Sequence, residues 1–482
     1  MVQIETLPNG VRIVTEPMDT VRSAALGIWV GGGSREEAPS ESGAAHFIEH
    51  MLFKGTQRRS AQDIARETDA IGGQMNAFTT KECTCFYGRV LDSHLPQALD
   101  ILFDMVYHSS FAQEAVETER GVILEEIDMY EDTPDDLCAE KLFGAVFQGS
   151  ALARPILGSA ETLAPMTGEF LREYHRAHYR GDNTVVALSG SFSQEILDEI
   201  RRRFAALPAG APQPVVPAVY TPAFVVTSKP IEQNHLTLAF PGLDYNSPKR
   251  FALQLLSSIL GGGVSSRLFQ QVRERQGLCY TIYSYGAGHA DTGVFCIYTA
   301  LNKETEAKAL ATIRQVVDQL RREGPTSEEL ERAREQSKAN VVMGLESTQS
   351  RMSHAGRSLL FSGEILTPEQ IIAAYDSVTH EDVVALAQEI FRWDQVSLST
   401  DWGRAQLTGP LWRPVSLDRR FSARTWPPGG RTGPLPMRAC WRVWKPSVLG
   451  GKRPWFCAGA PWGPFSPWTM PGAIPGEYRP WC

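Results

Sequence analysis

The sequence has no uninterrupted run of about 18 or more apolar residues, so it predicts no membrane-spanning helix. Its first residues, MVQIETLPNGVRIVTEP, contain neither the apolar core of a signal peptide nor an Arg-rich amphipathic presequence. We therefore expect a cytoplasmic protein. No basic run is long enough to suggest nucleic acid as a partner, and the formal net charge is -8.

Cysteine is sparse, and none of the eight Cys stands in a paired C-x-x-C zinc pattern. Cys83 and Cys85 are two residues apart in a predicted strand, so we expect them to share a face as buried, reduced thiols. The remaining composition, 43% hydrophobic and 21% charged residues, is ordinary for a globular protein. A chain of 482 residues exceeds what one core usually spans, which favours two domains.

Acidic residues nearly disappear at the C-terminal end, where Glu477 is the only one between Phe421 and Cys482. This stretch is rich in Trp, Pro, Gly and Arg, and no helix or strand period survives its prolines. It is either an appended basic, aromatic binding tail or a segment never selected as protein, such as a shifted reading frame would produce. We favour the second explanation and expect residues 416–482 to be disordered.

An internal duplication precedes this tail. Met166–Gly190 and Val378–Thr400 each contain a Thr-led helix start, an amphipathic helix, an aromatic–Arg pair and a β-rich strand. The predicted strands Ala24–Val30 and His235–Phe240 are each followed by a loop and an apolar helix. Because these matches keep a nearly constant offset, we infer that one fold unit occurs twice.

The fold class predicted for each unit is α+β, a mainly antiparallel sheet with packed helices, because hairpin-like strands are mixed with long helices. One hairpin is expected at Asn9-Gly10, a turn signal between two alternating runs. A Pro/Ala-rich stretch between the units is typical of a linker. The predicted boundaries are 1–206 for the first domain, 207–224 for the linker, 225–415 for the second domain and 416–482 for the tail.

A metal-binding motif lies in the first unit, in the segment GAAHFIEHMLF. His46 and His50 are about 40° apart around a helix, one turn apart, so both rings can reach one ion. Glu49 lies close to the same face, placed to take a proton from a metal-bound water. The H-x-x-E-H pattern is the inverted zinc motif. The alternative, two core histidines and a carboxylate satisfied by hydrogen bonds, would be costly on so apolar a helix.

A third ligand is expected elsewhere, because zinc sites need more than two protein ligands. The predicted helix QEAVETERGVILEEIDMYED has an apolar arc that includes Val122 and Met129. Glu119 and Glu126 lie within about 20° of each other in the middle of that arc, two turns apart. A cation would explain two carboxylates that face the core, although pairing with a buried Arg or a backbone amide is the alternative. Helical periodicity does not rank these two as the ligand.

The motifs HFIEHMLFKGT, GGQMNAFTTKECTCFY and ERGVILEEIDMYEDTPDD, in that order, resemble the pitrilysin/insulinase family of metallopeptidases, closest to its mitochondrial-processing-peptidase-like members. The resemblance covers nearly all of residues 1–415. It implies that His46, His50 and Glu126 hold zinc, that Glu119 supports the site from nearby, and that Glu49 is the general base.

The resemblance also gives a use to the strand region that follows. Gly72-Gly73 and Asn76-Ala77 precede an alternating run, Phe78–Tyr87, which we predict to be a strand at a sheet edge beside the metal. An extended substrate would add to this edge through main-chain hydrogen bonds, with Asn76 and Ala77 as contacts. The alternative is an ordinary paired strand. Phe53, one turn beyond His50, lines a pocket for the residue after the scissile bond or belongs to the core.

The second unit has no H-x-x-E-H at the equivalent place, where it has LQLLSS. It contains Arg273 and Tyr280 in the spacing R-x-x-x-x-L-x-Y. In the resembled family these two side chains reach the substrate at the metal, where a cation and a phenol would steady a tetrahedral oxyanion. The alternative is a solvated Arg and a Tyr that only packs.

These patterns predict a zinc metalloendopeptidase with one Zn²⁺ per chain, in which Glu49 activates the zinc-bound water. The two domains are expected to face each other across a substrate chamber that admits peptides or unfolded segments. Relatives commonly work as homodimers or beside a homologous chain, so the resemblance implies a dimer. The alternative function is a non-catalytic scaffold or core subunit of the same fold, although such relatives usually have an eroded metal motif.

Overall fold

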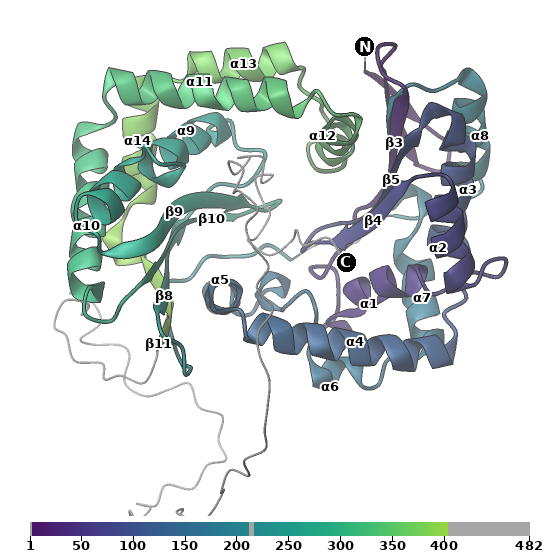
Figure 1. Cartoon of the computed structure of the whole chain (residues 1–482), viewed down its shortest axis with the longest axis horizontal. Helices are drawn as coiled ribbons and strands as arrows, with labels where there is room; N and C mark the ends of the chain where they lie inside the picture. Colours follow the sequence, from purple (N-terminus) through teal and green to yellow (C-terminus); the bar gives the residue numbers. More distant parts are fainter. Residues whose placement is uncertain (1, 212–215, 403–482) are drawn as a thin grey trace, which may run out of the picture. The chain divides into compact units, whose positions relative to one another are not determined.

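The computed structural model describes residues 2–211 and 216–402, which form two mixed sheets with packed helices (Figure 1). In the first sheet the strand order is β1-β2-β6-β3-β5-β4, and neighbours run antiparallel except β2 and β6. Its strands are β1 Gln3–Thr6, β2 Arg12–Pro17, β3 Ser23–Val30, β4 Gln74–Thr79, β5 Thr84–Leu91 and β6 Thr184–Gly190. The predicted hairpin at Asn9-Gly10 is confirmed, since β1 pairs with β2 and Gly10 has a φ of +93°.

The helices of the first half pack mainly on one face of this sheet, where Figure 1 shows α2, α3 and α8 side by side. Alternate residues of β3, such as Leu26 and Ile28, point into this core together with Phe47 and Phe204. The helices are α1 Ala44–Leu52, α2 Ala61–Ala70, α3 Leu95–His108, α4 Gln113–Glu131, α5 Pro134–Val146, α6 Ala160–Leu163, α7 Gly168–His178 and α8 Gln194–Phe204.

The second sheet repeats the first. Its order, β7-β11-β8-β10-β9, has one parallel pair, β7 with β11, at the place that β2 and β6 occupy in the first sheet. Its strands are β7 Phe224–Ser228, β8 Asn234–Pro241, β9 Cys279–Gly288, β10 Gly293–Leu301 and β11 Ser397–Trp402. Its helices are α9 Arg250–Gly261, α10 Glu306–Glu323, α11 Ser327–Gly344, α12 Thr348–Phe361, α13 Pro368–Ser377 and α14 His380–Ile390. The predicted α+β class with two homologous halves is confirmed.

Equivalent helices begin in the same way in both copies. The hydroxyl of Thr167 accepts a hydrogen bond from the amide of Phe170 and so caps α7. The hydroxyl of Thr379 does the same for α14, through the amide of Asp382. Each helix leads into the strand that forms the parallel pair of its sheet, β6 or β11, which supports the duplication inferred from the sequence.

The two halves exchange equivalent helices: α5 is the third helix after the antiparallel pair β4–β5, and α12 is the third helix after the antiparallel pair β9–β10. α12 packs against β2, β3 and β6 of the first sheet, and α5 packs against β7, β8 and β11 of the second. Met352 of α12 contacts the face of β3 opposite to the α3 side, where Trp29 is buried. Gly27 and Gly356 permit this close approach, since a Cβ on Gly356 would overlap the Trp29 indole. Each sheet is therefore covered partly by the other half.

The predicted single strand Phe78–Tyr87 is wrong, because this run is a hairpin. β4 ends at Thr79 and β5 begins at Thr84. The hydroxyl of Thr80 accepts hydrogen bonds from the amides of Glu82 and Cys83, at 3.2 Å and 3.0 Å, which closes a tight turn. The sheet edge is β4 itself, so Asn76 and Ala77 lie within the edge strand and not before it.

The remaining sequence predictions concern the domain boundaries, the C-terminal tail and the absence of a membrane-spanning helix. The domain boundaries 1–206, 207–224 and 225–415 stay predictions, and the tail 416–482 lies outside the described residues. Of the helices within residues 2–211 and 216–402, none has both the length and the apolarity that a membrane span requires.

Candidate metal centre

α1 is buried almost all round, as its apolar composition predicts. Phe47 and Ile48 lie in the core of the first half, and His46 is also buried. The residue before the helix, Gly43, has a φ of +97° and, as a glycine, has no side chain that could cap α1. The carboxylate of Glu37 takes that place, because it accepts hydrogen bonds from the amides of Gly43 and Ala45 at 3.0 Å and 2.9 Å.

α4 lies against α1 and brings the two candidate carboxylates to the histidines. Glu119 is buried and Glu126 is half-buried. Met129 was predicted to belong to the apolar arc, and this is wrong: it is 54% exposed.

His46, His50 and Glu126, which we call the His–Glu cluster, have one potential ligand atom each within 4.8 Å of one another. Glu126 Oε2 lies 3.6 Å from His46 Nε2 and 3.5 Å from His50 Nε2. These distances exceed those of good hydrogen bonds. They match the separation of about 3.4 Å between two atoms bound at about 2.1 Å to one tetrahedral zinc ion.

Buried atoms of the cluster have no hydrogen-bond partner among the described residues, namely His46 Nδ1 and Glu126 Oε2. An ionised, buried carboxylate oxygen without a donor is costly, and a cation between the two rings and Glu126 would remove that cost. Two imidazole nitrogens and one carboxylate oxygen are a donor set suited to zinc, and they leave a fourth position open. The residues present therefore fit the metal.

Glu119 supports the cluster from outside it. Its Oε2 lies 3.2 Å from His50 Nδ1, which leaves His50 Nε2 turned toward Glu126. Its other oxygen pairs with Lys54 Nζ at 2.7 Å. Burial opposes ionisation of Glu119, but the hydrogen bonds with His50 and Lys54 outweigh it and lower the pKa of this carboxyl.

The two imidazoles have opposite pKa shifts in the absence of metal. Burial and the neighbouring His50 lower the pKa of His46 to about 4, so that ring is neutral at pH 7. Burial also opposes charge on His50, but the hydrogen bond with Glu119 and the negative charge of the nearby Glu126 raise its pKa to about 9. The metal-free cluster therefore holds a proton on His50.

Glu49 is half-buried beside the cluster and is not one of its three members. Burial raises the pKa of its carboxyl to about 7, against the opposing effect of a hydrogen bond from Thr79. Thr79 Oγ1 donates that hydrogen bond to Glu49 Oε2 at 2.5 Å. A carboxyl group with a pKa near neutrality next to a metal site is suited to accept and return a proton.

The structure brings Arg273 and Tyr280 together. The Arg273 guanidinium lies 5.3 Å from the centre of the Tyr280 ring and 4.5 Å from that of Phe269. Tyr280 is 71% exposed. Within the described part of the chain, neither side chain forms a hydrogen bond or an ion pair with the His–Glu cluster.

The three predicted substrate contacts lie just after α1 and on β4, two elements that pack against each other. Phe53 follows the last residue of α1, is half-buried and packs against the core of the first half. Asn76 is exposed on the edge strand, and its side-chain oxygen accepts a hydrogen bond from the amide of Ala77 at 2.8 Å.

Sequence reasoning missed three side chains of this region. Lys54 reaches Glu119, Thr79 reaches Glu49, and Glu37 caps α1. The sequence weakly indicated the role of Glu37, because this is an acidic residue shortly before a buried helix that follows a glycine. No sequence pattern indicated the roles of Lys54 and Thr79, because their partners are far away in the sequence.

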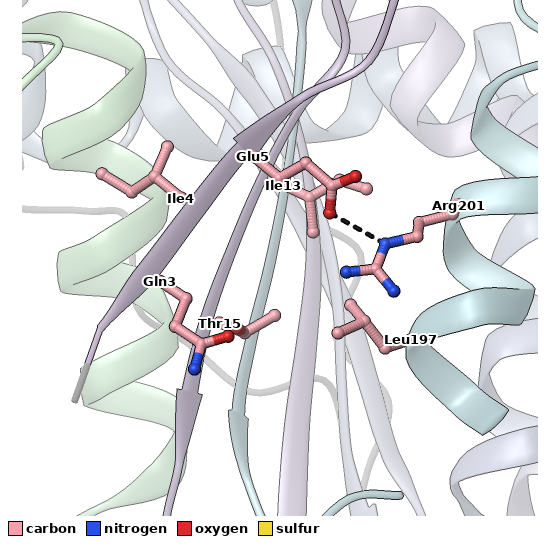
Figure 2. Close-up of a pocket in the computed structure, with 7 residues that line it drawn as sticks. All are labelled: Gln3, Ile4, Glu5, Ile13, Thr15, Leu197 and Arg201. Atoms are coloured by element: carbon pink, nitrogen blue, oxygen red, sulfur yellow. Dashed lines mark hydrogen bonds and ion pairs between the residues drawn. The ribbon is translucent and has the colours of Figure 1, made fainter. Parts of the chain in front are cut away.

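A separate surface hollow lies between β1, β2 and α8 (Figure 2). The Arg201 guanidinium at its rim is paired with Glu5 at 2.8 Å. No predicted site residue lines the hollow. It is therefore not part of the candidate metal centre.

Comparison with protein families gives two matches that together span most of the described chain. The model of the insulinase family, peptidase family M16, matches residues 12–160, which include the His–Glu cluster. The model described as the peptidase M16 inactive domain matches residues 165–337.

Individual relatives are similar over nearly their whole length. The chain is 42% identical to the uncharacterized zinc protease YmxG of Bacillus subtilis over 82% of this chain and 97% of that protein. It is 43% identical to the uncharacterized zinc protease SCO5738 of Streptomyces coelicolor, over 80% of this chain and 86% of that protein. A solved structure described as a peptidase M16 inactive domain from Pseudomonas fluorescens has a TM-score of 0.79 at 22% identity, covers 84% of this chain and 98% of that one, and so shares the fold.

The first prediction concerns the ligand set. Purified protein should hold about one zinc per chain, and His50→Ala should lose it, because two ligands are left. Elemental analysis after dialysis measures the metal. His380→Ala, at the half-buried first residue of α14, is the control and should keep full zinc. A His50→Ala protein with undiminished zinc would show that the ligand assignment is wrong.

The second prediction concerns pH. Because the pKa of His50 is about 9 without metal, zinc must displace its proton at any lower pH. Calorimetry at pH 7 in buffers of different ionisation enthalpy should therefore show release of about one proton per zinc. Apparent zinc affinity should rise about tenfold per pH unit from pH 6 to pH 8. Affinity independent of pH over this range would contradict the assignment of a protonated His50 as ligand.

Proposed function

The chain belongs to the insulinase family of zinc proteases, peptidase family M16, and from that premise we propose that it is a metalloendopeptidase that cleaves peptides or unfolded segments. The observation that carries the proposal is the convergence of His46, His50 and Glu126, with Glu49 beside them. Two imidazoles, a ligand carboxylate and a separate carboxyl with a pKa near neutrality are the side chains that hydrolysis at a metal requires.

The cofactor is zinc, one ion per chain in this proposal, held by the His–Glu cluster. When bound, zinc polarises the scissile carbonyl and lowers the pKa of the attacking water. Glu119 holds His50 by its Nδ1, so that Nε2 points to the ion site. Lys54, paired with Glu119 at 2.7 Å, keeps this supporting carboxylate ionised.

Glu49 carries the proton in the reaction. Its carboxylate accepts a proton from the water as the oxygen attacks the peptide carbon, and it later gives that proton to the nitrogen of the leaving amine. One proton therefore moves from water to amine, and Glu49 returns to its starting state. Its partial burial supports this role, because the raised pKa makes it a stronger base than an exposed carboxylate.

The edge strand β4 is proposed as the place where the substrate binds. β4 ends the strand order of the first sheet, so no strand of the described structure pairs with its outer edge, and an extended segment could add there. Asn76 and Ala77 would contact such a segment through the main chain. Phe53, at the end of α1, is proposed to line the pocket for the residue after the scissile bond.

We propose that Arg273 and Tyr280, which belong to the second half, contact the substrate. Their stacking leaves the Tyr280 side chain exposed and the guanidinium close to it, so one movement can bring both groups to a ligand. A cation and a phenol would steady the negative oxygen that develops on the scissile carbonyl.

A second candidate is a non-catalytic core subunit, suggested by the inactive-domain match over residues 165–337. That match leaves out α1 and α4, which carry the complete set of His46, Glu49, His50 and Glu126. The intact set favours the enzyme. A homodimer, or a heterodimer with a homologous chain, and a cytoplasmic location stay predictions.

The third prediction separates metal binding from chemistry. Glu49→Gln should keep zinc, because Glu49 is not a ligand, yet lose peptide hydrolysis by about 100- to 10,000-fold, because the water has no base. Zinc analysis and cleavage of an unstructured peptide library measure the two properties. Glu125→Gln, an exposed carboxylate beside Glu126 on α4, is the matched control and should keep full activity. Near-normal hydrolysis by Glu49→Gln would exclude it as the base.

The fourth prediction concerns Tyr280. Tyr280→Phe removes only an exposed hydroxyl, so the fold and the stacking with Arg273 should survive. Loss of one donor to the oxyanion should lower turnover by about 100-fold. Steady-state kinetics on a protein with wild-type circular dichroism and zinc content provide the measurement. Unchanged turnover with unchanged substrate affinity would leave Tyr280 with a packing role only.

A further inference from the structure

The hydroxyl of Thr79 is the only hydrogen-bond donor to Glu49 among residues 2–211 and 216–402. Its Oγ1 lies 2.5 Å from Glu49 Oε2, and the Thr79 residue is 7% exposed. An ionised carboxylate can only accept, so the hydroxyl proton must point at Glu49. Hydrogen bonds to a charged acceptor are shorter and stronger than neutral ones, which agrees with this distance.

The neighbouring hydroxyl of Thr84 does not compete for Glu49. Thr84 Oγ1 donates to the carbonyl of Gly32 at 3.0 Å and lies 3.5 Å from Thr79 Oγ1. Thr79 and Thr84 are paired across the β4–β5 hairpin. Of these two adjacent buried hydroxyls, Thr84 therefore donates to a backbone carbonyl and Thr79 donates to Glu49.

Thr79 is the last residue of β4, the edge strand, and the turn beyond it is held rigidly. Glu82, in this turn, forms an ion pair with Arg35 at 2.6 Å, and the side chain of Arg35 is 1% exposed. Arg35 also pairs with Asp291, in the β9–β10 turn of the second half, at 2.7 Å. Thr79 thus lies between a paired strand and a turn that the ion pairs of Arg35 hold in place.

We propose that Thr79 is the positioning residue for the base: its hydroxyl holds Glu49 Oε2, which leaves Oε1 turned to the water. The inference deepens the proposed function and rests on it. During the reaction the proton of the water passes to Glu49 Oε1, and the proton of Thr79 stays on its own oxygen. The hydroxyl takes no part in bond making and acts only on the direction of the carboxylate.

A consequence follows for the substrate. The strand that is proposed to hold it, β4, also holds the base, since Asn76 and Ala77 lie three and two residues before Thr79. The distance along β4 from the bound segment to the Glu49 carboxylate is therefore constant. A substrate that adds to this strand in one register places one peptide bond at the base.

The fifth prediction tests this role with two variants that separate the hydroxyl of Thr79 from its methyl group. Thr79→Val keeps the shape and removes the hydroxyl, and Thr79→Ser keeps the hydroxyl and removes the methyl group. Thr79→Val should retain zinc and a KM within about twofold of wild type, while kcat falls by about 10- to 100-fold because the base is misdirected. Thr79→Ser should recover most of kcat. Thr84→Val, which removes the neighbouring hydroxyl, is the matched control and should not reproduce the split between kcat and KM.

Crystal structures of zinc-loaded wild type, Thr79→Val and Thr79→Ser give a readout that does not depend on activity. The Glu49 carboxylate should turn or take several orientations in Thr79→Val and keep one orientation in Thr79→Ser. An unchanged Glu49 in Thr79→Val, a wild-type kcat in Thr79→Val, or a Thr79→Ser as slow as Thr79→Val would each overturn the proposal. Loss of zinc in Thr79→Val would also overturn it, since it would show a role in the metal site.

Glu49→Gln distinguishes failure of this inference from failure of the proposed function. If Glu49→Gln remains active, the base itself is wrong, whatever Thr79 does. If Glu49→Gln is inactive, adding Thr79→Val should lower the residual rate no further, because both changes act through one group. An additional loss of about tenfold or more in the double variant would show that Thr79 acts elsewhere.

Discussion

The burial of α1 is the constraint on which the rest of the structure depends. This helix lies in an apolar core and yet carries two imidazoles and a carboxyl group within five residues. Buried polar side chains need partners, and those of α1 come from α4, which brings Glu119 and Glu126, and from β4, which brings Thr79. Even the start of α1 depends on a distant group, the carboxylate of Glu37.

Although the fold unit occurs twice, only in the first copy does the helix at this place have an ionisable side chain among its buried residues. In the second copy, the helix equivalent to α1 is α9, whose buried residues include Leu255 and Leu256 and no ionisable side chain. Freed from metal binding, this half still supports the first one, since α12 covers the second face of the first sheet and Asp291 pairs with Arg35. The exchange of α5 and α12 joins the halves through buried apolar contacts and not through a linker alone.

Much of the fold follows from patterns that are local. The turn signal at Asn9-Gly10 and the strands near Ala24 and His235 are where the sequence predicts them, because alternation and glycine conformations act over a few residues. The error at Phe78–Tyr87 has the same origin. The run alternates through the turn, and only the hydrogen bonds of the Thr80 hydroxyl, together with the pairing of β4 with β5, reveal where the chain reverses.

The sequence by itself determined that His46, Glu49 and His50 lie near one face of one buried helix, because residues three and four apart on a helix are neighbours wherever that helix sits. It also determined that Glu119 and Glu126 point the same way, by the same periodicity. That periodicity does not rank the two carboxyls, and beyond what the resemblance implied it is the tertiary structure that puts Glu126 near both rings and Glu119 behind His50. The tertiary structure likewise decided that Thr79 meets Glu49 and that Arg273 stacks on Tyr280 beside Phe269. The helix period is a property of the local backbone, whereas the offset between α1, α4 and β4 is set by how their side chains pack, which no spacing along the chain encodes.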